Sequence, residues 1–185
     1  MASVLCHRQP DLTIILEDVH DPHNVSAVLR SCDAVGVQRV HTVYTHEERP
    51  SAFARTTSAG VAKWTEVTHH DSIEACVAML HGAGFQVLAA ALAPNAVDLY
   101  EADLTRPVAL LFGNEMRGAT PEALAAADGA LVIPMMGMVQ SLNISVACAV
   151  TLYEAMRQRR AAGAYAEPKL DAAALAALEI DWLKR

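Results

Sequence analysis

Short apolar runs alternate along this chain with longer segments in which apolar residues recur at helical spacing. The runs predict strands at residues 12–16, 40–44, 64–67, 86–91, 108–112 and 130–133. Helices are predicted at about residues 25–35, 72–83, 121–127, 142–161 and 170–183. Because neighbouring parallel strands need a long crossover, usually a helix, this order predicts an α/β fold: a parallel sheet flanked by helices.

Capping residues mark several of the predicted helix ends. Asn24 is expected to cap the helix at residues 25–35, and Gly36 to end it. Thr120 followed by Pro121 is typical of the start of a short helix, and Ser141 stands just before the long C-terminal helix. These caps predict where helix N-terminal amides can meet polar ligands.

The length of 185 residues, of which 53% are hydrophobic, suits one domain with a short appendage. We expect a domain at residues 1–162 and a helical tail at 163–185. The four cysteines form no CxxC pair, as is typical of reduced thiols packed as small apolar groups. The apolar runs are far shorter than the roughly 20 residues of a membrane span, and the N-terminus lacks a secretion signal. We therefore expect a cytoplasmic protein that does not contact a membrane.

Several familiar binding motifs are incomplete. Gly82 and Gly84 lack the third glycine of a dinucleotide-binding motif and follow a helix instead of a strand. Residues 113–118 have the glycine spacing of a phosphate-binding loop but lack its Lys-Ser/Thr pair. The histidines at 20 and 23, and those at 69 and 70, have no further ligand nearby at metal-site spacing, so no metal is expected.

Three polar segments are harder to explain by packing. They lie at residues 17–30, 110–118 and 133–145, and each follows or ends a predicted strand, at the sheet edge where parallel sheets bind ligands. Their polar side chains are those of Asn24, Arg30, Asn114, Glu115, Arg117, Ser141 and Asn143. A solvated loop, a plain strand-to-helix connection and a buried loop with Ser141 as N-cap remain the alternative interpretations.

Together the three segments resemble the motifs of the SpoU or TrmH family of RNA ribose 2′-O-methyltransferases, in the SPOUT class. They are HNVSAVLRSCDAVGV at 23–37, LLFGNEMRG at 110–118 and IPMMGMVQSLNISVACAVTLYEAMRQR at 133–159. The similarity covers about residues 8–160, with the motifs in family order. RQPDLT at 8–13 and GMVQSLN at 137–143 are most similar to members that methylate guanosine 18 in the tRNA D-loop.

The resemblance implies a SPOUT fold with a C-terminal deep trefoil knot, a homodimer, and S-adenosylmethionine as the cofactor. By position it implies a set of cofactor-binding residues, namely Leu111, Gly113, Glu115, Ile133, Met135, Ser141 and Leu142. It also implies polar catalytic positions at Asn24, Arg30, Glu115, Ser141 and Asn143.

Methyl transfer suits these residue types. A sulfonium methyl group is already electrophilic, so a protein needs to align it with a ribose oxygen and assist loss of that oxygen's proton. The family assigns proton acceptance to the arginine at the position of Arg30. Because an arginine pKa lies above about 12, the alternative is that Arg30 stabilises the developing alkoxide or holds the adjacent phosphate.

A net charge of −7 argues against a protein that coats nucleic acid indiscriminately, but it permits a local basic patch. We expect the RNA to be tRNA. Its contacts are assigned to six basic residues, namely Arg55, Lys63, Arg117, Arg157, Arg159 and Arg160. The alternative is that each is an ordinary solvated charge. Alternative functions are methylation of the tRNA wobble nucleotide or of ribosomal RNA. A catalytically silent module that binds cofactor and RNA is another.

Overall fold

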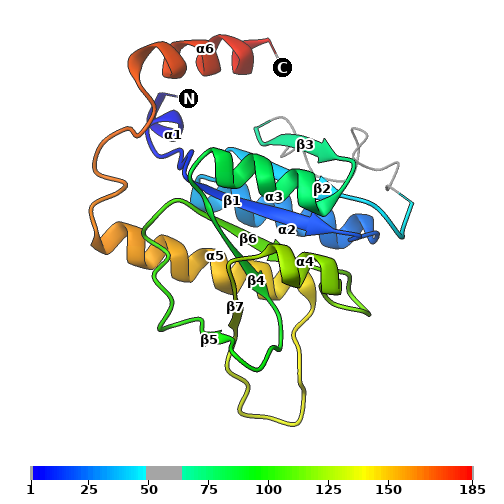
Figure 1. Cartoon of the computed structure of the whole chain (residues 1–185). Helices are drawn as coiled ribbons and strands as arrows, with labels where there is room; N and C mark the ends of the chain where they lie inside the picture. The colour runs from blue at the N-terminus through cyan, green and yellow to red at the C-terminus, as the bar shows by residue number, and fades with distance from the viewer. Residues whose placement is uncertain (1, 49–63, 185) are drawn as a thin grey trace.

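A seven-stranded parallel sheet forms the centre of the molecule (Figure 1). This computed structural model describes residues 2–48 and 64–184. The strand order is β3-β2-β1-β6-β4-β7-β5, and each neighbouring pair of strands is parallel. The predicted α/β class with a parallel, helix-flanked sheet is therefore confirmed.

The strands are short and rich in apolar residues. Their bounds are β1 Leu12–Glu17, β2 Arg39–Val43, β3 Glu66–His70, β4 Gln86–Ala90, β5 Val97–Asp98, β6 Val108–Phe112 and β7 Gly129–Val132. Every residue of β1 and of β6 is buried, as expected for central strands with helices on both faces. Six of these strands fall within a few residues of the predicted runs, whereas the two-residue β5 was not predicted.

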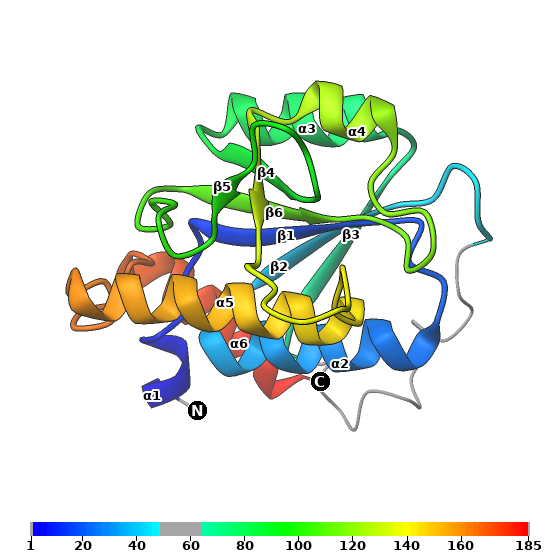
Figure 2. The ribbon, with the colours of Figure 1, turned by 90° about the horizontal axis from the view of Figure 1, so that it is seen from below.

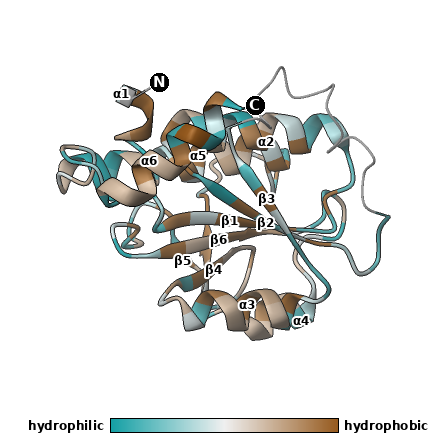
Figure 3. Cartoon of the chain, turned by 90° about the horizontal axis from the view of Figure 1, so that it is seen from above, coloured by the Kyte–Doolittle hydropathy of each residue, from teal (hydrophilic) through white to brown (hydrophobic). Residues whose placement is uncertain are grey.

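Helices cover both faces of the sheet (Figures 2 and 3). Their bounds are α1 Ala2–Leu5, α2 Pro22–Val35, α3 Ile73–Gly82, α4 Pro121–Ala126, α5 Ile144–Ala161 and α6 Ala172–Leu183. Figure 2 shows α3 and α4 on one face and α1, α2, α5 and α6 on the other. The two faces carry separate apolar clusters, so the core consists of two layers divided by the sheet.

Two predicted helix starts are wrong by a few residues. Asp21, not Asn24, caps α2, because its carboxylate accepts a hydrogen bond from the His23 amide and Pro22 occupies the first helical position. Asn143, not Ser141, caps α5 through a 2.9 Å bond from the Ser145 amide. Gly36 does end α2, in the left-handed conformation with φ 88°. Asn24 is therefore not needed as a cap, and Asn143 keeps its Nδ2 for a partner other than its own helix.

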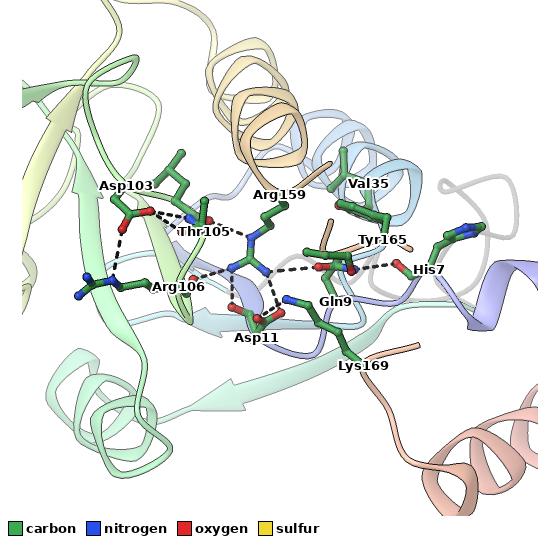
Figure 4. Close-up of polar contacts among 12 residues, drawn as sticks. His7, Gln9, Asp11, Val35, Asp103, Thr105, Arg106, Arg159, Tyr165 and Lys169 are labelled. Atoms are coloured by element: carbon green, nitrogen blue, oxygen red, sulfur yellow. Dashed lines mark hydrogen bonds and ion pairs between the residues drawn. The ribbon is translucent and has the colours of Figure 1, made fainter. Parts of the chain in front are cut away.

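A buried arginine joins the C-terminal end of α5 to the start of β1 (Figure 4). Arg159 is fully buried, and its guanidinium lies 2.7 Å from the Asp11 carboxylate. It also donates to the backbone oxygens of Leu104, Arg106 and Asp11 at 2.6–3.0 Å. The expectation that Arg159 contacts RNA is therefore wrong, because the guanidinium is saturated inside the protein.

The same cluster fixes the segment after α5. Lys169 places its ammonium 2.5 Å from the second Asp11 oxygen, and the Tyr165 hydroxyl donates to the Val35 carbonyl. Burial opposes ionisation of Asp11, but the Lys169 hydrogen bond and the Arg159 charge outweigh it and lower the pKa of the carboxyl below its usual value. At neutral pH the Asp11 carboxyl is therefore ionised.

Helix α6 packs back onto the N-terminal segment. Its Trp182 is buried, stacks edge-on against Trp64 at 5.0 Å, and lies 4.7 Å from the Arg8 guanidinium. Residues 163–184 therefore contact the domain body through both polar and aromatic groups. No helix in the described ranges is long and apolar enough to cross a membrane.

Replacing Arg159 by alanine should lower the free energy of unfolding by about 3 kcal/mol or more, since it leaves several buried backbone oxygens without donors. Urea unfolding followed by circular dichroism measures this. The matched control is Arg160→Ala, an exposed neighbour, which should change stability by less than about 0.5 kcal/mol. Equal effects of the two variants would contradict the structural role.

Candidate active site

Strands β1 and β6 pair in parallel, so their carboxyl ends bring two loops together. Leu16 is opposite Phe112, and the chain beyond each strand turns into one of the polar segments. Asn114 crosses between them, because its Nδ2 donates to the Asp18 carbonyl at 2.9 Å. Asp18 has the left-handed φ of 52°, and its carboxylate accepts the amides of Thr45, His46 and Glu47. The loop after β1 is thus held from both sides.

The loop after β6 is closed by a tight turn. Asn114 and Gly118 exchange two backbone hydrogen bonds of 3.0 and 2.9 Å. Thr120 next anchors the loop to Glu17, donating both its amide and its hydroxyl to that carboxylate. A Cβ atom on Gly113 would lie only 2.1 Å from the Ala119 nitrogen, so the turn requires glycine here.

Glu115 is the centre of a polar chain that joins all three predicted segments. Its Oε1 accepts hydrogen bonds from Asn24 Nδ2 at 3.0 Å and from the Asp21 amide at 3.4 Å. Asn143 continues the chain by donating from Nδ2 to Asn24 Oδ1 at 3.2 Å. Three of the five predicted catalytic residues are therefore in contact, although 91 and 119 positions separate Asn24 from its two partners.

His20 belongs to this chain and was not predicted. Its Nδ1 lies 3.3 Å from the buried Oε2 of Glu115, and its ring is half-exposed. The signal that could have identified it is its place in the same loop as Asn24, at the carboxyl end of the first strand. A carboxylate bonded by an amide on one oxygen and faced by an imidazole on the other is held in one orientation.

The other two predicted catalytic residues, Arg30 and Ser141, lie outside this chain. Arg30 is exposed on α2, and its guanidinium forms no hydrogen bond or ion pair with any residue in the described ranges. It follows Asn24 by six residues, so it projects about 240° around the helix from it. Ser141 is exposed two residues before the cap of α5.

The predicted cofactor residues lie in or just after β6 and β7 and in the loop before α5. Leu111 is buried in β6, Ile133 packs against the core just after β7, and Met135 and Leu142 are half-buried. Met135 and Leu142 belong to the loop before α5, for which a buried loop was one interpretation. It is instead exposed, with Met136 at 95% and Met138 at 99% exposure. The loop thus presents apolar side chains directly to its surroundings.

The predicted RNA-contact residues divide into several groups. Arg55 and Lys63 lie outside the described residues. Arg117 is half-exposed and pairs with Glu47 at 2.7 Å, next to the polar chain. On α5, Arg157 forms an ion pair with Glu154, and Arg160 is exposed.

Comparisons with known proteins agree on one family. Residues 11–153 match the model of the SpoU rRNA Methylase family. A tRNA (guanosine(18)-2′-O)-methyltransferase from Thermus thermophilus is 50% identical over 182 residues, covering 98% of this chain and 93% of that protein.

Two solved structures support the same relationship. The Aquifex aeolicus TrmH/SpoU tRNA modifying enzyme superposes with a TM-score of 0.90 at 36% identity, covering 99% of this chain and 93% of that one. The SpoU methyltransferase AviRb from Streptomyces viridochromogenes, solved with AdoMet, superposes at 0.72 with 27% identity. That match covers 83% of this chain and 62% of AviRb.

Gly113→Ala should destabilise the protein by about 1–3 kcal/mol, because the added methyl group meets the backbone of residues 118 and 119. Thermal unfolding measures the loss. Gly137→Ala is the matched control in the apolar loop, since nothing lies within 4 Å of the position that its added methyl group would take. Its effect should stay within about 0.5 kcal/mol. Equal melting temperatures for the two variants would contradict this account of the turn.

Proposed function

This chain belongs to the SpoU methylase family, and we propose that it transfers a methyl group from S-adenosylmethionine to the ribose 2′-hydroxyl of guanosine 18 in tRNA. The observation that carries the proposal is the Asn24–Glu115–Asn143 chain, which joins the three motifs at one edge of the sheet. The Thermus thermophilus relative that bears this activity in its name covers almost the whole chain. The residues of this protein therefore include the polar groups that such a methyltransferase needs.

The residues around this edge fit S-adenosylmethionine. Ile133, Met135 and Leu142 offer partly exposed apolar side chains for an adenine ring, and Leu111 and Gly113 contribute the end of β6 and the turn that follows it. Glu115 Oε2 is buried and accepts no hydrogen bond from the described residues, and His20 Nδ1 faces it at 3.3 Å, so it offers an acceptor or a counter-charge to a cationic ligand on the His20 side. When bound, this cofactor supplies the electrophilic methyl group.

Asn24 and Asn143 act as positioning residues in this proposal. Both polar atoms of each amide are engaged: Asn24 donates to Glu115 and accepts from Asn143, whose Oδ1 accepts the Ser145 amide, so both amides have a fixed orientation. Each Nδ2 keeps a second N–H that it can offer to a ligand. Glu115 accepts a hydrogen bond from Asn24 and so fixes its amide. Ser141 offers a further hydroxyl from the loop before α5. A ribose aligned by such groups has its 2′-oxygen directed at the methyl group.

Arg30 provides a permanent positive charge for the reacting oxygen. Its guanidinium has no partner within the described part of its own chain, so all its donors are available to an alkoxide or a phosphate. Because it projects away from Asn24, it would serve the site of a second subunit. We therefore propose a homodimer in which each site takes Arg30 from the partner.

Exposed apolar groups support this dimer. Met136, Met138 and Val139 in the loop, with Val146 and Tyr153 on α5, all expose roughly half or more of their surface. We further propose that the chain after β7 passes through the trefoil knot that the family resemblance implies. RNA would then contact Arg117 beside this edge. Arg157 and Arg160, near the C-terminal end of α5, and Arg55 and Lys63 are the other basic residues proposed to bind RNA.

The direct test is methyl transfer from labelled S-adenosylmethionine to unmodified tRNA, followed by digestion and nucleoside mass analysis. We expect 2′-O-methylguanosine in the D-loop, and a loss of at least about 100-fold in rate for Arg30→Ala. Arg106→Ala, an exposed arginine paired with Asp103, is the matched control and should keep full activity. Transfer to another nucleotide, or none with the cofactor bound, would refute the assignment to guanosine 18.

Sharing of sites between subunits is tested by mixing two inactive variants. Arg30→Ala and Asn143→Ala should each be inactive alone, whereas heterodimers formed by co-expression should regain activity, because one of their two sites keeps both residues. Light scattering should give about twice the chain mass for each sample. A stable monomer, or heterodimers as inactive as their parents, would contradict the composite site.

A further inference from the structure

Three side chains with metal-binding atoms meet at the β2–β3 edge of the sheet, outside the proposed active site. His41 lies on β2, His70 ends β3, and Cys76 lies on α3, which contacts both strands. In the strand register Val43 is opposite His70 and His41 is opposite Thr68, so His41 and His70 share one face. Val43 packs in the same apolar cluster as Cys76, which identifies that face as the one beneath α3.

The atoms are close enough to share one ion. His41 Nδ1 and His70 Nε2 lie 2.9 Å apart, and these nitrogens and the Cys76 sulfur are all within 4.8 Å of one another. In a tetrahedral zinc site, bonds of about 2.0–2.3 Å place neighbouring ligand atoms about 3.5 Å apart. Rotamer adjustments of about 1 Å therefore suffice to form such a site.

The burial of the three groups favours a specific site over a chance surface cluster. His41 and Cys76 are buried, whereas His70 is half-buried and leaves a route for an ion and a water molecule. All three arise from regular secondary structure, and residues from three elements must pack together before the cluster exists. No step of the proposed methyl transfer uses any of them.

We propose that His41, His70 and Cys76 bind one zinc ion, which fastens the edge strand β3 to α3, with water in the fourth position. Two imidazoles and a thiolate select zinc over magnesium or calcium, which prefer oxygen ligands. Because the ion would bind the folded state alone, it would raise the stability of the protein. The sequence did not predict a metal site at His69 and His70, because the other proposed ligands, His41 and Cys76, are not next to them in the chain.

Protonation states fit this proposal. Burial, then His70 and Arg39, lower the pKa of His41 to about 4, so its imidazole is neutral at pH 7, as a ligand must be. Burial raises the pKa of the Cys76 thiol to about 12, so the metal must displace its proton. The proton between the two rings moves to another ring nitrogen, and the net release is one proton from the thiol.

With zinc bound, the charged groups around the cluster would nearly cancel one another. Among the described residues Arg39 is a nearby cation, and it is paired with Glu66 at 2.9 Å. Asp71 follows His70 and places its carboxylate near that ring, where it raises the pKa against the effect of burial. A zinc ion with one thiolate carries a net charge of +1, which Asp71 offsets.

The test is a titration of untagged, chelator-treated protein with Co²⁺ and then Zn²⁺. We expect one Co²⁺ per chain with a thiolate-to-cobalt charge-transfer band, displacement by Zn²⁺, and a higher melting temperature with metal. Cys76→Ser should abolish the band, and His70→Gln, at a half-buried position, should weaken binding by at least about 100-fold.

His69→Gln is the matched control, because it changes the neighbouring residue on the opposite face of β3, whose ring contacts Thr42. It should bind Co²⁺ as the parent protein does. Absence of the charge-transfer band in the parent protein, or metal affinity unchanged in His70→Gln, would overturn the proposal. The readout is independent of methyl transfer, so the two proposals can fail separately.

Discussion

The parallel pairing of β1 with β6 is the interaction on which the candidate site depends. Paired residues of the two strands, such as Leu12 and Val108, are 96 positions apart in sequence. The contact that this pairing makes possible joins Asn24 to Glu115, which are 91 positions apart. At the strand ends the Glu17 carboxylate accepts a hydrogen bond from the Thr120 amide. Just beyond them, Asn114 donates a hydrogen bond to the Asp18 carbonyl. These cross-loop bonds fix the direction of both loops, so Glu115 reaches the first turn of α2. Without that pairing, the polar residues would lie on three separate loops with no contact between them.

How far the sequence predicts this structure depends on whether the signal is local. Central strands such as β1 and β6 were found because each is a continuous apolar run, and α4 because Thr120-Pro121 marks its start. Arg159 shows a missed local signal. It lies four and seven residues after the buried Ala155 and Leu152, the spacing of an inward face, and this separates it from the exposed Arg160. The sequence analysis considered only their charge and therefore predicted that both Arg159 and Arg160 contact RNA.

Contacts between distant segments were beyond any such reasoning. Motif resemblance placed Asn24, Glu115 and Asn143 in one list, but only the fold shows that these three touch while Arg30 and Ser141 do not. The unpredicted His20 entered through the same geometry. In the His41–His70–Cys76 cluster, too, each residue stands on a different element, and strand register decides which histidine of the pair at 69 and 70 faces α3.

Stability and chemistry occupy opposite edges of this sheet. Asp11, at the amino end of β1, binds Arg159 and Lys169, and its carbonyl also accepts the Val108 amide at the amino end of β6. Glu17 and the Glu115 chain lie at the carboxyl ends of the same two strands. Because apolar core residues fill the strands between, each edge keeps its own polar network. A buried ion pair can thus lock the termini of the domain in place without restricting the polar groups that a substrate must reach.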